Sequence, residues 1–367
     1  MTSYEKGSPD GDYVRVPKER LFSFVSRVLE SIGIPKEDAK IVADNLVMAD
    51  LRGVESHGVQ RLRRYVDGIR SGGVNVHPRI RVLREGPSYA LVDGDEGLGQ
   101  VVGRLAMELA IEKAEKSGIG VVAVRNSNHY GIAGYYSLMA AERDMIGISM
   151  TNSRPLVAPT GSVERFLGTN PISVAAPTRG RPFLLDMATS IVPIGKLEVY
   201  RRKGEPIPEG WAINGEGRLT TDVKDVFSNG ALLPLGGLGE LLGGHKGYGL
   251  SLMVDVLTGV LSGGTWSRHV GNTEERNSEV DHFFMAIKIE NFTPVEEFKS
   301  RMESMISELK ALKKHPRFER IWVHGEKGFL TMETRLKLGI PIYLGVLREL
   351  NRIGMETGAG KLMEEGG

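Results

Sequence analysis

The segment IGVVAVRNSNHYGIAGYYSLMA, residues 119–140, decides the fold class of this chain. A short apolar run, GVVAV, passes into the polar sequence RNSNHYG and then into a segment of helical character. Strand, loop and helix in this order are typical of an α/β unit, whose ligands bind beyond the carboxyl ends of strands. His129 falls at such an end, and Asn128 is a favourable helix N-cap whose following N–H groups would attract an anion. A turn histidine bonded to its own loop is the alternative interpretation of His129.

The flanking sequence predicts a layered α/β core preceded by helices. Apolar residues recur with helical spacing from Lys18 to Ile32, and Pro35 opens a second helix, so the chain begins with a helical hairpin. From Ile80 onward, short apolar runs alternate with glycines and amphipathic stretches. The runs predicted as strands are IRVL, YALVDG, IGVVAV, IGISMTN, ISVAAP, FLLDMA and, much later, FFMAIKI. The run GLSLMVDVLTGVLSGG predicts a buried core helix, and the connection 263–281 predicts a lid or interface element.

The composition favours an enzyme that acts on small molecules. The 367 residues suffice for a large core and two domains. Lys and Arg number 47 against 46 Asp and Glu, a formal net charge of +1, so no strong field attracts nucleic acid or anionic lipid. The longest apolar stretch is too short to cross a bilayer, and MTSYEKGSPDGDY lacks the apolar run of a signal peptide, so we expect a cytoplasmic protein. The absence of cysteine excludes disulfides and thiolate chemistry.

The glycine-rich segments do not match the usual nucleotide-binding fingerprints. GLGQVVG and GLGELLG both contain GxG, but each places the third glycine at the wrong spacing for a dinucleotide loop. GGHKGYG contains a lysine but lacks the Lys-Ser or Lys-Thr pair of a phosphate-binding loop. A nicotinamide enzyme with this sequence would need a different way of holding its cofactor.

The histidines fall into two groups. His57, His245 and His324 adjoin glycine and His129 lies two residues before one, and glycine lets a backbone approach a ligand. The other four, His77, His269, His282 and His315, are predicted to have surface or packing roles. If Ser56 caps a helix, His57 and Arg61 lie four residues apart on one face, with β-carbons about 5–6 Å apart. The Arg61 fork could then hold a carboxylate while the imidazole meets a neighbouring hydroxyl or carbonyl. A helix start stabilised by His57 is the alternative.

Three further segments place polar side chains near the ends of predicted strands or at a glycine-flanked turn. The residues are Ser153 and Arg154 in TNSRP, Asp186, Thr189 and Ser190 in LLDMATS, and His245 and Lys246 in GGHKGYG. A structural turn explains each segment alone. Together with the two histidine segments, they predict a polar cluster at one edge of the sheet.

Several ordered motifs resemble those of the malate/L-lactate dehydrogenase family, which lacks a Rossmann fold. The motifs are SHGV with Arg61 four residues after its histidine, NSNHYGIAGYY, LGTNP, LDMATS followed by Gly195-Lys196, IPEGWAI and HKGYGL. Sulfolactate, ureidoglycolate and diketogulonate dehydrogenases also belong to this family. The resemblance runs from about Val16 to the last helix and is greatest to the archaeal malate dehydrogenases. Tyr130 departs from the phenylalanine of many members.

The resemblance implies an α/β fold with a non-Rossmann, NAD(P)-binding mixed-sheet core and a smaller helical domain. We expect the helical domain to comprise residues 14–75 and 330–362, and the α/β cofactor- and substrate-binding domain to comprise residues 76–329. The implied activity is hydride transfer between NAD or NADP and a small 2-hydroxy or 2-oxo acid, with malate and oxaloacetate as the expected pair. L-sulfolactate or L-lactate is the alternative substrate. The implied assembly is a homodimer with sites near the subunit contact.

The resemblance also implies roles for individual residues. Members of the family are described with the acid/base on the histidine that matches either His57 or His129, and a histidine pKa suits that task. Arg61 matches a substrate-carboxylate ligand, with Ser56 and Ser153 as further substrate contacts. The implied cofactor contacts are Arg154, Asp186, Ala188, Thr189, His245, Lys246, Gly325 and Glu326.

Two interpretations from other classes remain at this stage. A metal-dependent hydrolase would use His57, His129, His245 or His324 as ligands beside Asp186. No HExxH or comparable ligand spacing supports it, so we expect no metal site. A non-enzymatic, glycine-rich metabolite-binding protein is the other alternative.

Overall fold

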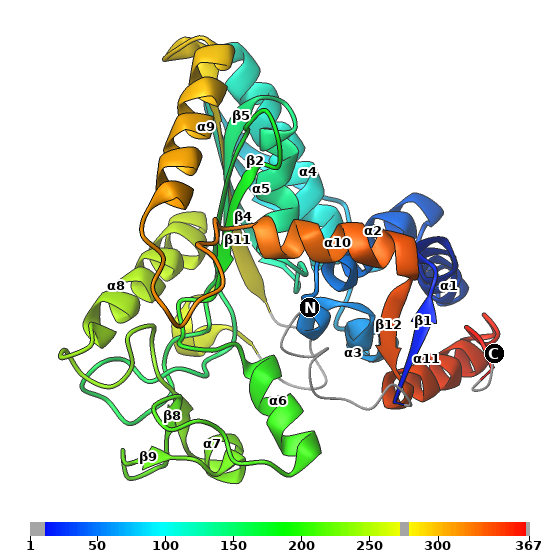
Figure 1. The fold of residues 1–367 in the computed structure, drawn as a ribbon. Helices are drawn as coiled ribbons and strands as arrows, with labels where there is room; N and C mark the ends of the chain where they lie inside the picture. Colours follow the sequence, from blue (N-terminus) through cyan, green and yellow to red (C-terminus); the bar gives the residue numbers. More distant parts are fainter. Residues whose placement is uncertain (1–11, 272–278, 365–367) are drawn as a thin grey trace.

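The computed structural model describes residues 12–271 and 279–364, and a seven-stranded mixed sheet forms its centre (Figure 1). In spatial order the strands are β2 (Arg81–Glu85), β3 (Tyr89–Asp93), β4 (Ile119–Ser127), β11 (Val280–Lys288), β5 (Met145–Thr151), β6 (Ile172–Ala176) and β7 (Phe183–Met187). β3 and β4 are parallel, and the other neighbouring pairs are antiparallel. The mixed α/β core is therefore confirmed. The central strand, β11, comes from far along the sequence.

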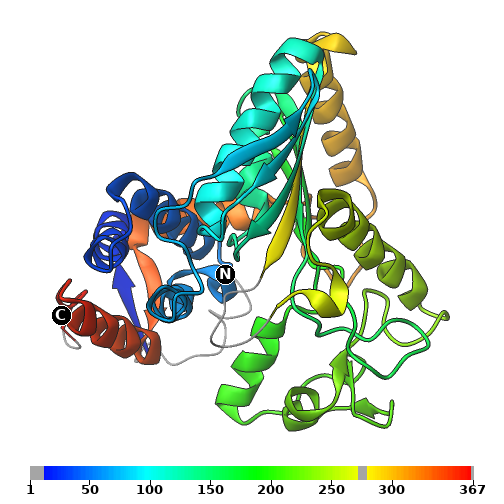
Figure 2. The ribbon, with the colours of Figure 1, turned by 180° about the vertical axis from the view of Figure 1, so that it is seen from behind.

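Helices cover both faces of this sheet (Figure 2). α4 (Gly99–Ser117) and α5 (Ala133–Ala141) pack on one face, where Val122 and Val124 of β4 are buried. α8 (Gly244–Asp255) packs on the other face, where Val121 belongs to the cluster around Val254. Because successive side chains of a strand point to opposite faces, a strand covered on both sides reads as a continuous apolar run. This explains the sequence GVVAV.

The first and the last elements of the described chain lie side by side (Figure 1). The elements concerned are β1 (Tyr13–Val16), α1 (Lys18–Ser31), α2 (Lys36–Leu51), α3 (Leu62–Arg70), α10 (Glu326–Leu338), β12 (Ile340–Tyr343) and α11 (Leu344–Thr357). β1 pairs antiparallel with β12. One apolar cluster joins the buried face of α1, including Leu21 and Val25, to Ile340 and Leu347 near the other end. The predicted N-terminal helices, α1 and α2, are confirmed.

A third group of elements lies at the far end of the sheet from α4 and α5 (Figure 1). It contains α6 (Ile194–Lys203), β8 (Ala212–Ile213), β9 (Leu219–Thr220), α7 (Val223–Ser228) and β10 (Ala231–Leu232), with the strands in the order β10-β8-β9. These elements share a separate apolar cluster that includes Leu197, Val226 and Leu232. α9 (Val295–Ala311) follows β11 and runs along the molecule beside the sheet.

The segment predicted as a buried core helix is helical but only half buried. α8 continues into a π-helical turn, Val256–Val260. Val254 is buried against the sheet, whereas Met253, Val256 and Val260 are exposed, because only one side of the helix packs on a sheet face. Within the predicted lid, residues 272–278 lie outside the described residues, as does the N-terminal segment 1–11. None of the helices in the described part of the chain combines the length and hydropathy needed to cross a membrane.

His282 lies in the middle of the sheet and has a packing role. Its side chain is completely buried on β11, and its ring stacks on Tyr130 with centroids 4.6 Å apart. Nδ1 lies 2.8 Å from Thr151 Oγ1, and Nε2 lies 2.9 Å from Ser127 Oγ. Burial lowers the pKa of this imidazole from 6.5 to about 3. The folded protein therefore holds a neutral His282 at every pH at which the enzyme is expected to work.

We predict that His282→Gln lowers the free energy of unfolding by about 2–4 kcal/mol at pH 7, because the stacked ring and two buried hydrogen bonds are lost. In the unmodified protein, stability should fall as the pH drops below 6.5, because the unfolded imidazole then binds a proton that the folded one does not. The variant should show a shallower loss between pH 6.5 and pH 4. Urea unfolding across this range measures both effects. The exposed His77→Gln variant is the control, and equal slopes in all three proteins would contradict the prediction.

Candidate active site

The segment with SHGV is not one helix, so the predicted geometry of His57 and Arg61 is wrong. Two 3₁₀ turns, Glu55–His57 and Val59–Arg61, are separated by Gly58 in an extended conformation with φ −84° and ψ −156°. Ser56 lies inside the first turn and caps no helix. A Cβ on Gly58 would lie 1.8 Å from Asp50 Oδ1, and Asp50 Oδ2 accepts a hydrogen bond of 2.8 Å from the backbone N–H of Val59. The contact with α2 therefore breaks the helix.

A buried arginine from the C-terminal part of the chain holds this segment in place. The Arg335 side chain on α10 is 1% exposed, and its guanidinium donates hydrogen bonds to the Asp50 carbonyl and, at 2.6 Å, to Glu55 Oε1. Burial raises the pKa of the Asp50 carboxyl to about 8, so it is largely protonated at neutral pH. The turns that carry His57 and Arg61 are thus fixed to both α2 and α10.

His57 and His129 come together although they are distant in sequence. Their rings are stacked, with centroids 5.6 Å apart and planes inclined by 16°. Both side chains are partly exposed. Ser56 Oγ lies 2.9 Å from His57 Nδ1, and the Tyr65 hydroxyl lies 2.7 Å from His129 Nδ1. This pair forms the centre of the candidate site.

The tautomer of His129 follows from its neighbours. The Tyr65 oxygen accepts a hydrogen bond of 2.7 Å from Gln100 Nε2, which leaves its own hydrogen for His129 Nδ1. The neutral imidazole then carries its hydrogen on Nε2. Tyr65 and Gln100 are both buried, so this arrangement is protected from water. Neither residue was identified from the sequence.

The loop that carries His129 also differs from the prediction. Asn128 is not an N-cap, because its side-chain amide donates to the carbonyls of Glu96 and Gly97 at 2.7 and 3.1 Å. α5 starts only at Ala133, and the N–H of Gly134 in its first turn donates to Asp186 Oδ2 at 2.8 Å. A side chain of the protein thus occupies the N-terminus that was predicted to attract an anion.

The charges of Arg61 and Arg64 act on the histidine pair, and the charge of Arg154 acts on Arg64. Arg61 donates from Nε to the Ser56 carbonyl at 2.7 Å, and its Nη2 lies 3.7 Å from Glu198 Oε2 on α6. Arg64 was not identified from the sequence, although the spacing in RLRRY places it one helical turn after Arg61. Its charge acts on both histidines, on Arg61 and on Arg154, which lies in the segment after β5. The arginine cluster, Arg61, Arg64 and Arg154, is thus drawn from two distant parts of the chain.

Burial, assisted by these charges, keeps both imidazoles neutral. Burial lowers the pKa of His57 from 6.5 to about 3, with Arg61 and Arg64 adding to the effect. Burial likewise holds the pKa of His129 well below its usual value, with further contributions from Arg64, His57 and Arg61. Neutral imidazoles are able to accept a proton, and the surrounding guanidinium groups attract an anion. The arrangement therefore suits removal of a hydroxyl proton from a bound molecule that also carries a carboxylate.

Ser153 has an internal role in the structure. Its hydroxyl accepts a 3.0 Å hydrogen bond from the N–H of Thr169, and its own N–H donates to Asn170 Oδ1 at 3.1 Å. These bonds tie the segment after β5 to the LGTNP motif. They also position the neighbouring Arg154.

The predicted cofactor residues form a second group around β7. Asp186 is accessible to solvent, yet burial of its carboxyl group by the surrounding protein raises the pKa of that group. The buried Arg52 guanidinium acts in the opposite direction. The carboxylate is therefore recessed. Ala188 is half-buried, and the Thr189 hydroxyl donates to the Asn170 carbonyl at 2.9 Å.

The remaining cofactor candidates adjoin this strand from two sides. Gly325 has a φ of +93°, and its neighbour His324 accepts a bond of 3.2 Å from the N–H of Leu184 on β7. Glu326 is buried and accepts hydrogen bonds from Lys310, from Arg320 and from the N–H of Val323. His245 and Lys246 are exposed at the start of α8, and Lys246 lines a hollow of about 430 Å³. Leu235, another residue of that hollow, donates to the Thr189 carbonyl at 2.9 Å.

No set of three or more His, Asp or Glu side chains within residues 12–271 and 279–364 is arranged to hold a metal ion. The interpretation as a metal-dependent hydrolase therefore lacks a set of metal ligands among these residues.

Comparisons with known proteins find relatives along almost the whole length of this chain. The family model for malate/L-lactate dehydrogenase matches residues 16–351. The chain is 76% identical over 355 residues to malate dehydrogenase of Pyrococcus abyssi, covering 97% of this chain and 98% of that protein. It is 43% identical over 337 residues to L-sulfolactate dehydrogenase of Methanocaldococcus jannaschii, covering 90% and 94%. The solved structure of malate dehydrogenase from Pyrococcus horikoshii superposes with a TM-score of 0.90 at 72% identity, covering 96% and 98%.

We predict that Tyr65→Phe releases His129 from its fixed tautomer. The variant should lose about 1–2 kcal/mol of stability, because buried Gln100 loses its hydrogen-bond acceptor. Nitrogen NMR shifts of the His129 ring should move toward a mixture of the two neutral tautomers. Tyr135→Phe, which removes a hydroxyl bonded instead to Asp44, is the control and should leave those shifts unchanged. An unaltered His129 spectrum in the Tyr65 variant would refute the assignment.

Proposed function

Because the chain belongs to the malate/L-lactate dehydrogenase family, we propose that it is a nicotinamide-dependent malate dehydrogenase that interconverts malate and oxaloacetate. One observation carries the proposal at the level of the site. Two neutral imidazoles, with ring centroids 5.6 Å apart, lie in partly exposed positions where the charges of Arg61 and Arg64 act on both. This arrangement provides a base for a hydroxyl proton beside a binding site for a carboxylate.

Oxidation of a 2-hydroxy acid removes a proton from the hydroxyl and a hydride from the adjacent carbon. A bound nicotinamide would supply the acceptor for that hydride. His57 or His129 receives the proton, and both are neutral before substrate binds. The Arg61 guanidinium holds the carboxylate next to the hydroxyl, with its Nε already fixed on the Ser56 carbonyl. Ser56 and Ser153 complete the proposed substrate contacts.

The binding of an anion also prepares the reverse reaction. The positive charges of Arg61 and Arg64 help to keep the pKa of His57 low in the empty site. A bound carboxylate offsets those charges and so raises the pKa of the imidazole. The histidine is then able to carry the proton that the 2-oxo acid needs. Substrate binding and proton loading are therefore coupled through the same arginines.

The second group of residues fits a dinucleotide. The recessed carboxylate of Asp186 is suited to ribose hydroxyls. The neighbouring guanidinium of Arg52 is buried, with Nε and Nη1 lacking hydrogen-bond partners among the described residues. A Cβ on Gly325 would lie 3.0 Å from Leu184 Cβ, so glycine keeps this backbone open beside β7.

We assign the remaining cofactor contacts to the following residues, with NAD or NADP as the cofactor: Arg154, Ala188, Thr189, His245, Lys246 and Glu326. Because the side chains of Thr189 and Glu326 already have partners inside the protein, these two would act through their backbone or through the shape of the site. Lys246 is exposed at a helix start, where its charge favours phosphate.

We propose a homodimer as the functional unit, with the sites near the subunit contact. The support is an apolar surface on α8 and the following turn. Leu250, Met253, Val256 and Val260 are all exposed there, and Leu241 in the preceding loop is 96% exposed. Contiguous apolar surfaces of this kind are typical of contacts between proteins.

Replacing the acid/base histidine should abolish most of the activity. We predict that His57→Ala or His129→Ala lowers kcat for malate oxidation by about 10²–10⁴-fold, depending on which is the proton acceptor. In the unmodified enzyme kcat/KM should stay level well below pH 6.5, because the free imidazole has a low pKa. Steady-state kinetics from pH 5 to pH 9 test both points, with the exposed His77→Ala as the control. Near-normal kcat in both variants would refute the assignment.

Arg61→Lys should weaken binding of the substrate carboxylate. A lysine ammonium provides a point charge and cannot reproduce the planar fork, so we expect KM for malate to rise about tenfold with a smaller change in kcat. Arg70→Lys changes the same residue type on the exposed part of α3 and is the matched control. An unchanged KM in the Arg61 variant would exclude this residue as the carboxylate ligand.

A further inference from the structure

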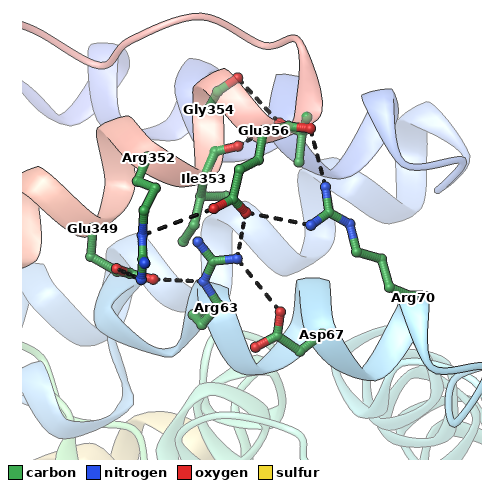
Figure 3. Close-up of polar contacts among 9 residues, drawn as sticks. Arg63, Asp67, Arg70, Glu349, Arg352, Ile353, Gly354 and Glu356 are labelled. Atoms are coloured by element: carbon green, nitrogen blue, oxygen red, sulfur yellow. Dashed lines mark hydrogen bonds and ion pairs between the residues drawn. The ribbon is translucent and has the colours of Figure 1, made fainter.

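Arg63 on α3 binds three carboxylates, as Figure 3 shows. Its Nε lies 2.6 Å from Glu349 Oε1, and its Nη1 lies 2.7 Å from Glu356 Oε2 and 3.5 Å from Asp67 Oδ1. Glu349 and Glu356 belong to α11, whereas Asp67 belongs to α3 itself. Arg352, also on α11, forms ion pairs with both of these glutamates. Arg63 thus connects α3 to a network of charges on α11.

Arg70 makes a weaker contact with the same network. Its Nη1 lies 3.4 Å from Glu356 Oε2, and its Nη2 donates to the Glu356 carbonyl at 3.2 Å. The Arg70 side chain is 44% exposed, against 23% for Arg63. Water and salt screen an exposed ion pair strongly, whereas a partly buried member of a network is screened less. The attachment of α3 to α11 therefore depends mainly on Arg63.

The opposite side of α3 reaches the candidate active site. Tyr65 lies two residues after Arg63, and this spacing turns its side chain by about 200° around the helix axis. Its ring is buried, and its hydroxyl lies 2.7 Å from His129 Nδ1. α3 therefore lies between α11 and the loop that carries His129.

α3 has few features of its own that would fix its position. It has nine residues with Gly68 among them, and no side chain within the described ranges caps its first turn. A short helix with an internal glycine is marginal in isolation, so contacts with the rest of the protein decide where it lies. Leu62 and Val66 bury one face in the apolar cluster shared with α1 and α11, but apolar burial has no preferred direction. The charged contacts with α11 are directional and restrain the helix along and around its axis.

We propose that Arg63 is a positioning residue of the candidate active site. Its contacts with Glu349 and Glu356 fix α3 against α11. The Tyr65 hydroxyl is thereby kept on His129 Nδ1, and a shift of α3 would leave the imidazole with a mixture of its two neutral tautomers. The effect on catalysis rests on the proposed function, because only one tautomer presents the required nitrogen to a substrate.

The test replaces Arg63 and its partner on α11 separately. In Arg63→Gln and in Glu349→Gln, the nitrogen NMR shifts of the His129 ring should move toward a mixture of neutral tautomers. The amide hydrogens of α3 should also exchange about tenfold faster. Arg70→Gln removes the same charge from the same helix and should change neither readout. Glu349→Gln keeps Arg63 itself, so the test holds even if Arg63→Gln does not fold.

A double variant shows whether Arg63 acts through Tyr65. We expect Tyr65→Phe to lower kcat/KM for malate about tenfold, the loss of one hydrogen bond, and Arg63→Gln to lower it about fivefold. If both changes act through the bond to His129, the double variant should lose about tenfold in total, whereas independent effects would multiply to about fiftyfold.

Each outcome decides the role of Arg63. Unchanged His129 shifts in both single variants, or losses that multiply in the double variant, would overturn it. Equally faster exchange in α1, α2 and α3 would show a general loss of stability and would overturn it as well. If the unmodified protein oxidises no malate with NAD or NADP, the proposed function fails, while the NMR and exchange measurements still decide whether Arg63 holds α3 in place.

Discussion

The hydrogen bond between the Tyr65 hydroxyl and His129 Nδ1 joins the two halves of the proposed site. Tyr65 belongs to a helix packed in the apolar cluster formed by the two ends of the chain, and His129 belongs to the loop after a strand of the central sheet. Because α3 also carries Arg64 and begins directly after Arg61, this contact sets the position of both guanidinium groups against the imidazole. A shift of the helices relative to the sheet would separate the charges from the base.

Other contacts of the fold hold the hydrogen bond between Tyr65 and His129 in place. Arg335 on α10 fixes the turns that carry His57, and β1 pairs with β12. Both interactions link residues near the start of the chain to residues near its end. The N-terminal helices are therefore held by the C-terminal elements and not only by their own apolar faces. A long-range clamp of this kind suits a site that must hold two imidazoles and several like charges close together, since those charges repel one another.

The local sequence pattern predicted the helices and strands. The prediction failed where long-range contacts determine the structure. Apolar runs and glycines located the strands, because a strand buried on both faces has a distinct sequence. The placement of β11 between β4 and β5 could not be predicted from the sequence, because nothing in the segment FFMAIKI specifies the neighbouring strands. The predicted helix at Ser56 is broken by Asp50, and the predicted cap at Asn128 is lost to Glu96. Both competing partners lie outside the windows in which helix signals operate. The two-domain division and the roles of the site residues stay predictions.

The prediction of the site residues was limited in the same way. The resemblance in sequence motifs selected His57, His129 and Arg61, but gave no reason to single out Arg64, whose meaning depends on which side of α3 faces α11. Arg63 and Arg70 contact Glu349 and Glu356 on α11, whereas the charges of Arg61 and Arg64 act on His57 and His129. Burial and these two charges together keep the empty imidazoles ready to accept a proton. A bound anion offsets the charges, so that charge balance and proton affinity change in the same step.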